Sequence, residues 1–161
     1  MEHSPRYTVL FALAVCGVCS VFVASAAVSL KDRQIENQRL DVQTKVLGLA
    51  GLMDPSDRLP REEIGRLFED RVTARVVELE SGAYAEDMDP AAFDQRTASK
   101  DPELSRDAPR NAAKVMRLPI HGKVFQVLED GKVDALILPI EGKGLWSTLY
   151  GFIALSADTR T

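Results

Sequence analysis

KVFQVLEDGKVDALILPI, residues 123–140, is the stretch that decides the fold. It holds two apolar runs, and Asp130-Gly131 separates them. An Asp-Gly pair suits the two-residue turn of a β-hairpin, because both residue types tolerate the left-handed backbone conformation that this turn requires. We therefore predict two antiparallel strands, over 123–129 and 132–140.

Three further strands are predicted around this hairpin. Residues 72–79, VTARVVEL, are rich in β-branched side chains and run into the turn residues Ser81-Gly82. Apolar runs at 115–120 and 149–155 complete the set. Residues 83–111 carry three prolines among charged side chains, which predicts a surface excursion with one short helical turn.

Two helical patterns precede the strands. In the first, apolar residues three and four positions apart form a stripe that Asp54-Pro55-Ser56-Asp57 ends; its members are Ile35, Val42, Val46, Leu49 and Met53. The second helix begins at Pro60, has acidic residues in its first turn, and carries an apolar face made of Ile64, Leu67 and Phe68. Together the elements predict an α+β domain with a twisted antiparallel sheet.

The N-terminal segment is apolar without interruption. Residues 7–30, YTVLFALAVCGVCSVFVASAAVSL, contain no charge and no proline, and as a helix they span about 36 Å, enough to cross a bilayer core. We predict a tail at 1–6, a transmembrane helix at 7–30 and one soluble α+β domain at 31–161. The alternative is a signal peptide cleaved after Ala24-Ser25-Ala26.

The charges beside this helix bear on its orientation. One basic residue, Arg6, precedes it, whereas Lys31, Arg33, Arg39 and Lys45 follow it. The positive-inside rule read alone therefore favours a cytoplasmic domain, although that rule is weak for long translocated domains.

Composition excludes several classes of function. The net charge is −4 and basic residues are scattered among acidic ones, so we expect no nucleic-acid binding. Both cysteines, Cys16 and Cys19, lie in the apolar helix, where we read them as small apolar side chains. His121 is the only histidine after that helix and has no partners at a ligand or triad spacing, so we predict no metal site and no catalytic residue.

The C-terminal part holds the residues of most interest. Residues 118–123 and 138–143 nearly repeat one another, which we interpret as similar turns at strand ends. Gly142-Lys143-Gly144 suits a phosphate cradle or a flexible turn. Trp146 is the only tryptophan, and its indole suits either stacking on a planar ring system or a place in the core.

The run Gly142-Lys143-Gly144-Leu145-Trp146-Ser147-Thr148-Leu149-Tyr150-Gly151-Phe152 resembles the C subunit of the bacterial sodium-translocating NADH:quinone reductase. The resemblance extends to Leu30-Lys31-Asp32-Arg33-Gln34 and to the helix at 37–52, and it covers essentially the whole chain.

The resemblance implies an electron-transfer subunit of a translocase that oxidises NADH, reduces ubiquinone and moves sodium ions. It further implies one uncleaved helix in the inner membrane and a periplasmic domain. The implied partners are the other subunits of the complex and membrane lipid, and the implied cofactor is covalently bound flavin mononucleotide (FMN). On residue type and resemblance together, we expect Leu145, Trp146, Ser147 and Thr148 to line one side of the flavin pocket. Trp146 would give apolar contact, and the hydroxyls would bond ring or ribityl oxygens.

One departure from the family concerns the attachment of the flavin. The family joins FMN through its phosphate to the threonine of a Ser-Gly-Ala-Thr motif nearer the C-terminus, and this chain has no such motif. Ser81-Gly82-Ala83-Tyr84 carries tyrosine at the acceptor position, so we interpret it as a turn. We therefore expect an N-terminal portion of a longer protein that is not catalytic alone, with an unpaired sheet edge and an incomplete core.

Two alternatives remain at this stage. The first is the G subunit of the related ferredoxin-oxidising electron transport complex, which uses the same kind of flavin domain. The second is a cofactor-free protein with a single membrane anchor that serves in binding or assembly.

Overall fold

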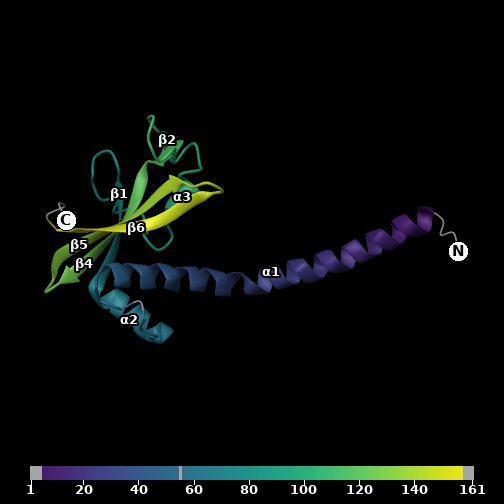
Figure 1. Cartoon of the computed structure of the whole chain (residues 1–161), viewed down its shortest axis with the longest axis horizontal. Coiled ribbons are helices and arrows are strands. Elements are labelled where there is room, and N and C mark those ends of the chain that lie inside the picture. The colour runs from purple at the N-terminus through teal and green to yellow at the C-terminus, as the bar shows by residue number, and fades with distance from the viewer. Residues whose placement is uncertain (1–4, 55, 158–161) are drawn as a thin grey trace. The chain divides into compact units, whose positions relative to one another are not determined.

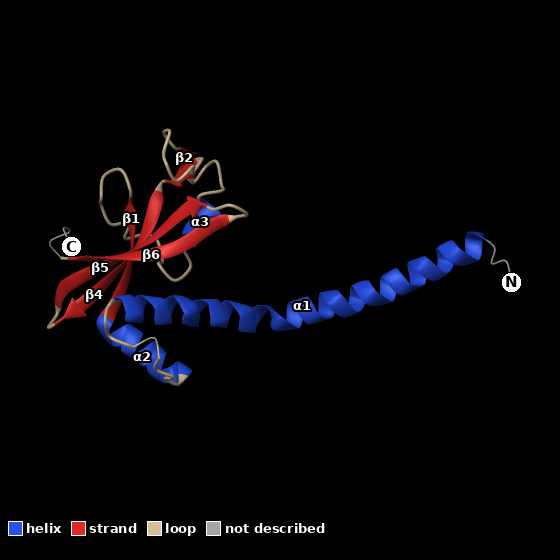
Figure 2. Cartoon of the chain, in the orientation of Figure 1, coloured by secondary structure: helices blue, strands red, loops and turns tan. Residues whose placement is uncertain are grey.

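The computed structural model describes residues 5–54 and 56–157, and these residues divide into two compact units between Asp41 and Val42. Figures 1 and 2 show the helices and strands of the chain. In chain order they are α1 (Pro5–Leu49), α2 (Arg61–Arg71), β1 (Val72–Glu78), α3 (Gln95–Ala98), β2 (Ser105–Asp107), β3 (Arg117–Pro119), β4 (His121–Glu129), β5 (Lys132–Lys143) and β6 (Thr148–Ser156).

The first unit is the greater part of α1. This helix is long and apolar enough to cross a membrane, and it lies near the N-terminus. Its apolar side chains in this part are exposed, from 45% for Val15 to 75% for Val28. The expected apolar helix is therefore present, and it continues without a break to Leu49.

The second unit is built on an antiparallel sheet with the strand order β1-β4-β5-β6. The predicted hairpin is confirmed: β4 and β5 pair on either side of Asp130 and Gly131, whose φ angles of 50° and 75° are both left-handed. A register shift between Val127 and Leu128 bends the pair. The predicted α+β class with a twisted antiparallel sheet is confirmed.

The core lies on one face of this sheet, under the end of α1 and α2. Its buried members are Val46, Leu47, Met53, Val72, Phe125, Val127 and Ile137, and three aromatic rings join edge to face across it, with Phe125 6.1 Å from both Phe68 and Phe152 between centroids. The predicted apolar face of the second helix is confirmed, because Ile64, Leu67 and Phe68 all pack on this cluster.

The end of α1 differs from the prediction. Gly51, with φ of 68°, takes the left-handed position, Leu52 N–H donates to the Leu47 carbonyl at 3.0 Å, and Gly51 N–H donates to the Gly48 carbonyl at 3.2 Å. This glycine cap ends the helix at Leu49, before Asp54. The predicted stripe is also wrong in part: Leu49 is 46% exposed and Ile35 54%, whereas Leu47 is buried.

The excursion before β4 contains more structure than predicted. The expected helical turn is α3, but β2 was missed because three residues are too few to show a strand period. β2 pairs with β3 in a second small sheet. The two near-repeats are not equivalent turns: 118–123 runs from β3 into β4, with His121 in a strand, and 138–143 lies inside β5.

Candidate functional site

The residues expected to line a flavin pocket lie in and beside the turn that joins β5 to β6. This turn borders a hollow of about 480 Å³. Residues from three segments line the hollow: Ser99 and Lys100; Lys114, Val115, Met116 and Arg117; and Glu141 to Thr148 with Tyr150. The structure thus brings all four expected residues, Leu145, Trp146, Ser147 and Thr148, to one place.

The turn is tight, and one glycine makes it possible. Gly144 N–H donates to the Ser147 carbonyl at 2.9 Å. A Cβ at Gly144 would lie 2.8 Å from that carbonyl oxygen and 2.9 Å from Leu149 Cγ. The glycine is therefore needed for close approach, and the interpretation of 142–144 as one flexible turn is wrong, since Gly142 and Lys143 end β5.

The tip of the turn is almost fully exposed. Leu145 is 92% and Trp146 93% exposed. The alternative that placed Trp146 in the core is therefore wrong. Ser147 and Thr148 are also exposed, so an indole ring and two hydroxyl groups face the solvent together.

Four basic residues and one acidic residue, Glu141, line the hollow. Lys100, Lys114 and Lys143 line it and are exposed. Arg117 also lines it, but its guanidinium already donates to Ser105 Oγ at 2.8 Å and to Asp107 Oδ1 at 2.7 Å, with a further bond to the Ser105 carbonyl at 2.9 Å. Arg117 therefore stabilises β2 and β3, and the three lysines supply the accessible positive charge.

The position of Lys114 follows from a side-chain cap that sequence reasoning missed. Asn111 Nδ2 donates to the Val115 carbonyl at 2.8 Å, and Val115 N–H donates to Asn111 Oδ1 at 3.0 Å. Lys114 sits in this loop with a left-handed φ of 52°. Lys143 N–H donates to the Ala113 carbonyl at 2.8 Å, which joins the loop to β5. Asparagine is a common turn residue, but the partner of this loop on β5 could not be read from the sequence.

Helix α3 contacts β6 beside the hollow. The Arg96 guanidinium lies 4.1 Å from the centre of the Tyr150 ring, a cation–π contact between α3 and β6. Asp94 caps α3, because its carboxylate accepts hydrogen bonds from Arg96 N–H at 3.0 Å and from the Thr97 hydroxyl at 2.8 Å. Burial alone raises the pKa of the Asp94 carboxyl, but these hydrogen bonds outweigh it and the pKa is lowered.

The same helix contacts β4. Gln95 Oε1 accepts from Lys123 N–H at 2.9 Å. Burial lowers the pKa of the Lys123 ammonium, and the charges of Asp94 and Asp89 offset part of this effect. α3 thus contacts two strands of the sheet, β4 and β6.

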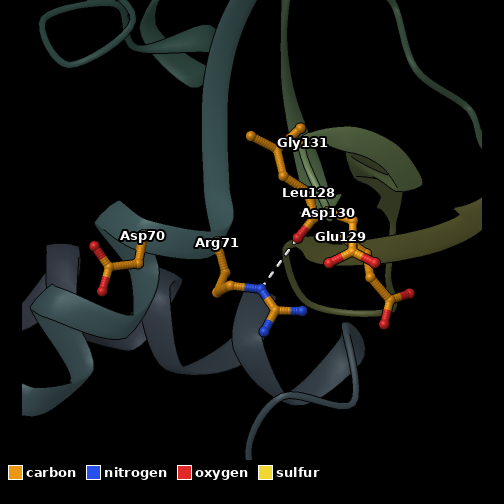
Figure 3. A pocket seen from close by; sticks show the side chains of 6 residues that line it. All are labelled: Asp70, Arg71, Leu128, Glu129, Asp130 and Gly131. Atoms are coloured by element: carbon orange, nitrogen blue, oxygen red, sulfur yellow. Dashed lines mark hydrogen bonds between the residues drawn. The ribbon is translucent and has the colours of Figure 1, made fainter.

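A second hollow, of about 350 Å³, lies at the other end of β5 (Figure 3). Arg71 Nε donates to the Leu128 carbonyl in this hollow at 3.1 Å. Three acidic residues also line the hollow: Asp70, Glu129 and Asp130. Within the described residues no group of three or more His, Cys, Asp or Glu side chains is arranged to hold a metal ion. This hollow contains none of the expected site residues.

The Ser81 to Tyr84 segment is a turn, as interpreted from the sequence. Gly82 has φ of 73° and its N–H donates to the Glu78 carbonyl at 2.8 Å. Tyr84 pairs with Val77 in an isolated bridge, and its hydroxyl accepts from Gln126 Nε2 at 2.8 Å. The segment does not line the hollow beside Trp146.

Comparison with known proteins gives a consistent result. No family model matches the chain. It is 47% identical to the C subunit of the Na(+)-translocating NADH-quinone reductase of Pseudomonas aeruginosa, over 99% of this chain and 61% of that protein. It is 41% identical to the C subunit of the same enzyme from Neisseria meningitidis, over 96% of this chain and 58% of that protein. The chain spans about three fifths of the length of the curated relatives it matches.

A solved structure agrees with these relatives. The crystal structure of Shewanella oneidensis NqrC superposes with a TM-score of 0.68 at 30% sequence identity. The match covers 76% of this chain and 55% of that chain. The likeness therefore includes the fold as well as the sequence.

Proposed function

Because this chain belongs to the family formed by the C subunits of the Na(+)-translocating NADH-quinone reductases, we propose that it transfers electrons as a component of such a membrane complex. Its role there is to relay electrons, while NADH oxidation, quinone reduction and sodium movement belong to the whole complex. The other subunits of that complex are its partners. The relatives named above are all C subunits, which favours this role over the G subunit of the ferredoxin-oxidising complex.

We propose that the chain holds FMN at the hollow beside the β5–β6 turn. The observation that carries this proposal is the exposed Trp146 indole next to two hydroxyls and three lysines. An indole stacks on a flat ring system, Ser147 and Thr148 can bond polar ring or ribityl atoms, and lysines attract a phosphate. Leu145 extends the apolar contact. When bound, the flavin supplies one- and two-electron redox chemistry.

This chain's own residues prepare the site in three ways. Gly144 permits the tight turn that presents Leu145 and Trp146. The Asn111 cap holds the loop that carries Lys114. Asp94 caps α3, and Arg96 of this helix contacts the Tyr150 ring, which lines the hollow. No attachment residue for a covalent link is assigned among these side chains.

Titration of FMN into the full chain in detergent tests the flavin site. Stacking quenches flavin fluorescence, so the signal should fall on binding. Trp146→Ala should weaken binding by about tenfold, a loss of roughly 1.4 kcal/mol, which is within the range expected for an aromatic pair. Trp146→Phe should retain most of the affinity.

Leu104→Ala is the control for the flavin site, since Leu104 is 45% exposed and does not line the hollow. It should bind FMN as the wild type does. If Trp146→Ala binds FMN as well as the wild type, this site is refuted. If no variant and no wild-type chain binds FMN, the cofactor-free anchored protein becomes the better description.

We also propose that α1 crosses the inner membrane and that the second unit lies in the periplasm. The length and apolar composition of α1 and its place near the N-terminus support the crossing. The periplasmic side is taken from the family and disagrees with the basic residues after the helix.

Cysteine labelling tests the orientation, because both natural cysteines lie in α1. Glu103→Cys places one thiol at an exposed site of the second unit. A membrane-impermeant maleimide should label it in intact cells, through an outer membrane made permeable. Labelling only after the inner membrane is opened would place the unit in the cytoplasm.

A further inference from the structure

The three most exposed large apolar side chains of the described residues gather at one place. Leu145 is 92%, Trp146 93% and Met116 82% exposed, whereas the largest value in α1 is 75%, for Val28. All three line the hollow beside the β5–β6 turn. Apolar surface in water is unfavourable, and a group of exposed apolar side chains marks a place where a ligand or partner binds. Met116 therefore needs the same explanation as Trp146.

Met116 is held by its backbone and not by its side chain. It directly precedes β3, and its carbonyl accepts from Ala108 N–H at 2.9 Å. The residue before it is also fixed, because Val115 N–H donates to Asn111 Oδ1 at 3.0 Å. The Met116 side chain is thus presented to solvent from a backbone that hydrogen bonds hold in place. A binding surface that is formed before the ligand arrives costs less to order on binding.

The loop that carries Met116 and the turn that carries Trp146 are joined through β5. Lys143 N–H donates to the Ala113 carbonyl at 2.8 Å, and a Cβ at Gly142 would lie 3.7 Å from Ala113 Cβ. The turn begins directly after Lys143, where β5 ends. Both segments border the same hollow, whose volume of about 480 Å³ is in the range of small-molecule sites. Met116 and Trp146 therefore bring apolar side chains to one ligand-sized space from two distant parts of the chain.

Methionine suits the face of a flat ring. Its side chain is unbranched and flexible, and its polarisable sulfur makes favourable contacts with aromatic rings. The exposed side chains that line the hollow include three lysines as well as the three apolar residues. A ligand with a flat ring at one end and a phosphate at the other matches both kinds of side chain, and FMN has this form.

We propose that Met116 packs its thioether on one face of the flavin ring, while Trp146 stacks on the other face. This inference rests on the flavin site proposed above and deepens it, because it adds a ring contact from outside residues 145–148. The ring is then held between two apolar side chains, and the phosphate is left to the lysines. Leu145 extends the contact on the Trp146 side.

The methyl signals of the methionines test this contact directly. The chain contains four methionines, and Met53 and Met88, unlike Met116, do not line the hollow. The full chain in detergent is labelled with carbon-13 at the methionine methyl groups, and each signal is assigned by its loss in a leucine variant. The face of an aromatic ring shields a nucleus stacked on it, whereas the ring edge deshields it. FMN should therefore move the Met116 signal to lower chemical shift and leave those of Met53 and Met88 in place.

Substitutions measure the same contact through the FMN affinity. Met116→Ala should weaken FMN binding by about two- to tenfold, the range expected for a sulfur–aromatic contact. Met116→Leu keeps an apolar side chain of similar volume and should stay within about twofold of the wild type. Met116→Gln keeps the length of the side chain but makes it polar, so it should weaken binding as Met116→Ala does.

Met88→Ala is the matched control. It makes the same chemical change at a half-buried residue that does not line the hollow, so the FMN affinity should be unchanged. Slow hydrogen exchange of the β4 amides verifies that each variant is folded.

The outcomes separate this inference from the flavin site itself. If the wild-type chain binds FMN but the Met116 signal stays in place or moves to higher chemical shift, the contact is refuted while the site at Trp146 stands. A folded Met116→Ala variant that binds FMN as tightly as the wild type would refute the contact as well. If the wild-type chain binds no FMN, the flavin site fails, and the role of Met116 fails with it.

Discussion

Replacing Leu47 by alanine tests whether the last two turns of α1 belong to the core of the second unit. Leu47 is fully buried and belongs to the core cluster. Removing a buried leucine side chain loses its transfer free energy, about 1.5–3 kcal/mol, and leaves a cavity that adds to the loss. Leu47→Ala should therefore lower the free energy of unfolding by about 3–5 kcal/mol.

Leu49→Ala is the control, because it makes the same chemical change two residues later in the same helix. Leu49 is 46% exposed, so roughly half of the transfer free energy is at stake and little cavity forms. Alanine is also a slightly better helix former than leucine. The loss should be about 1 kcal/mol or less.

Urea unfolding of the full chain in detergent measures both variants, with unfolded molecules detected by pulse proteolysis. Trp146 fluorescence is unsuitable because this side chain is 93% exposed in the folded protein. Equal losses for the two variants, or a larger loss for Leu49→Ala, would refute the assignment of Leu47 to the core. That outcome would support the stripe predicted from the sequence, in which Leu49 faced inward.

Four further substitutions each change a single position. Gly65→Ala should raise the free energy of unfolding by about 0.5–1 kcal/mol, because the added Cβ would meet nothing within 4 Å in α2. Gly144→Ala should lower the free energy of unfolding by about 1–3 kcal/mol, because the added Cβ would lie 2.8 Å from the Ser147 carbonyl oxygen. Urea unfolding measures both changes. Arg117→Ala should lower it by about 2–3 kcal/mol and speed hydrogen exchange in β2, since its guanidinium bonds to Ser105 and neighbouring groups. Asp94→Ala should remove a helix cap and lower the free energy of unfolding by about 1 kcal/mol at neutral pH. The folded-state pKa of Asp94 is lowered from 3.8, so the stability difference between wild type and variant should persist above pH 3.8 and shrink as the pH falls below it. Urea unfolding at a series of pH values measures this difference.

Local signals in the sequence predicted most of the second unit. The Asp130-Gly131 turn and the β-branched run that became β1 depend on residues next to one another, and both were placed within a residue or two. The face of α2 was also predicted, because its three apolar residues follow a clean helical period. The predicted end of α1 is wrong because it follows the Asp54-Pro55 break, whereas the left-handed φ of Gly51 ends the helix earlier.

The candidate site was predictable only in part, for a physical reason. Trp146 and its neighbours form a continuous string, so residue type and resemblance were enough to select them. Lys100 and Lys114 come from distant segments, and only the folding of those loops beside β5 brings them to the hollow. The choice between a buried and an exposed Trp146 depended on the Gly144–Ser147 bond, a contact that composition does not reveal.

The two faces of the β5–β6 hairpin differ in their relation to the proposed flavin site, and this difference can be tested by experiment. Lys143, Thr148 and Tyr150 share the core face with Ile137, whereas Ile153 belongs to the other face. Ile153→Glu should therefore leave the FMN affinity of the chain unchanged, whereas Trp146→Ala should weaken it. Titration of FMN into both variants measures this. If Ile153→Glu abolished FMN binding in a chain whose β4 amides remained protected from hydrogen exchange, the flavin site would extend to both faces of the hairpin, and the assignment by strand alternation would be wrong.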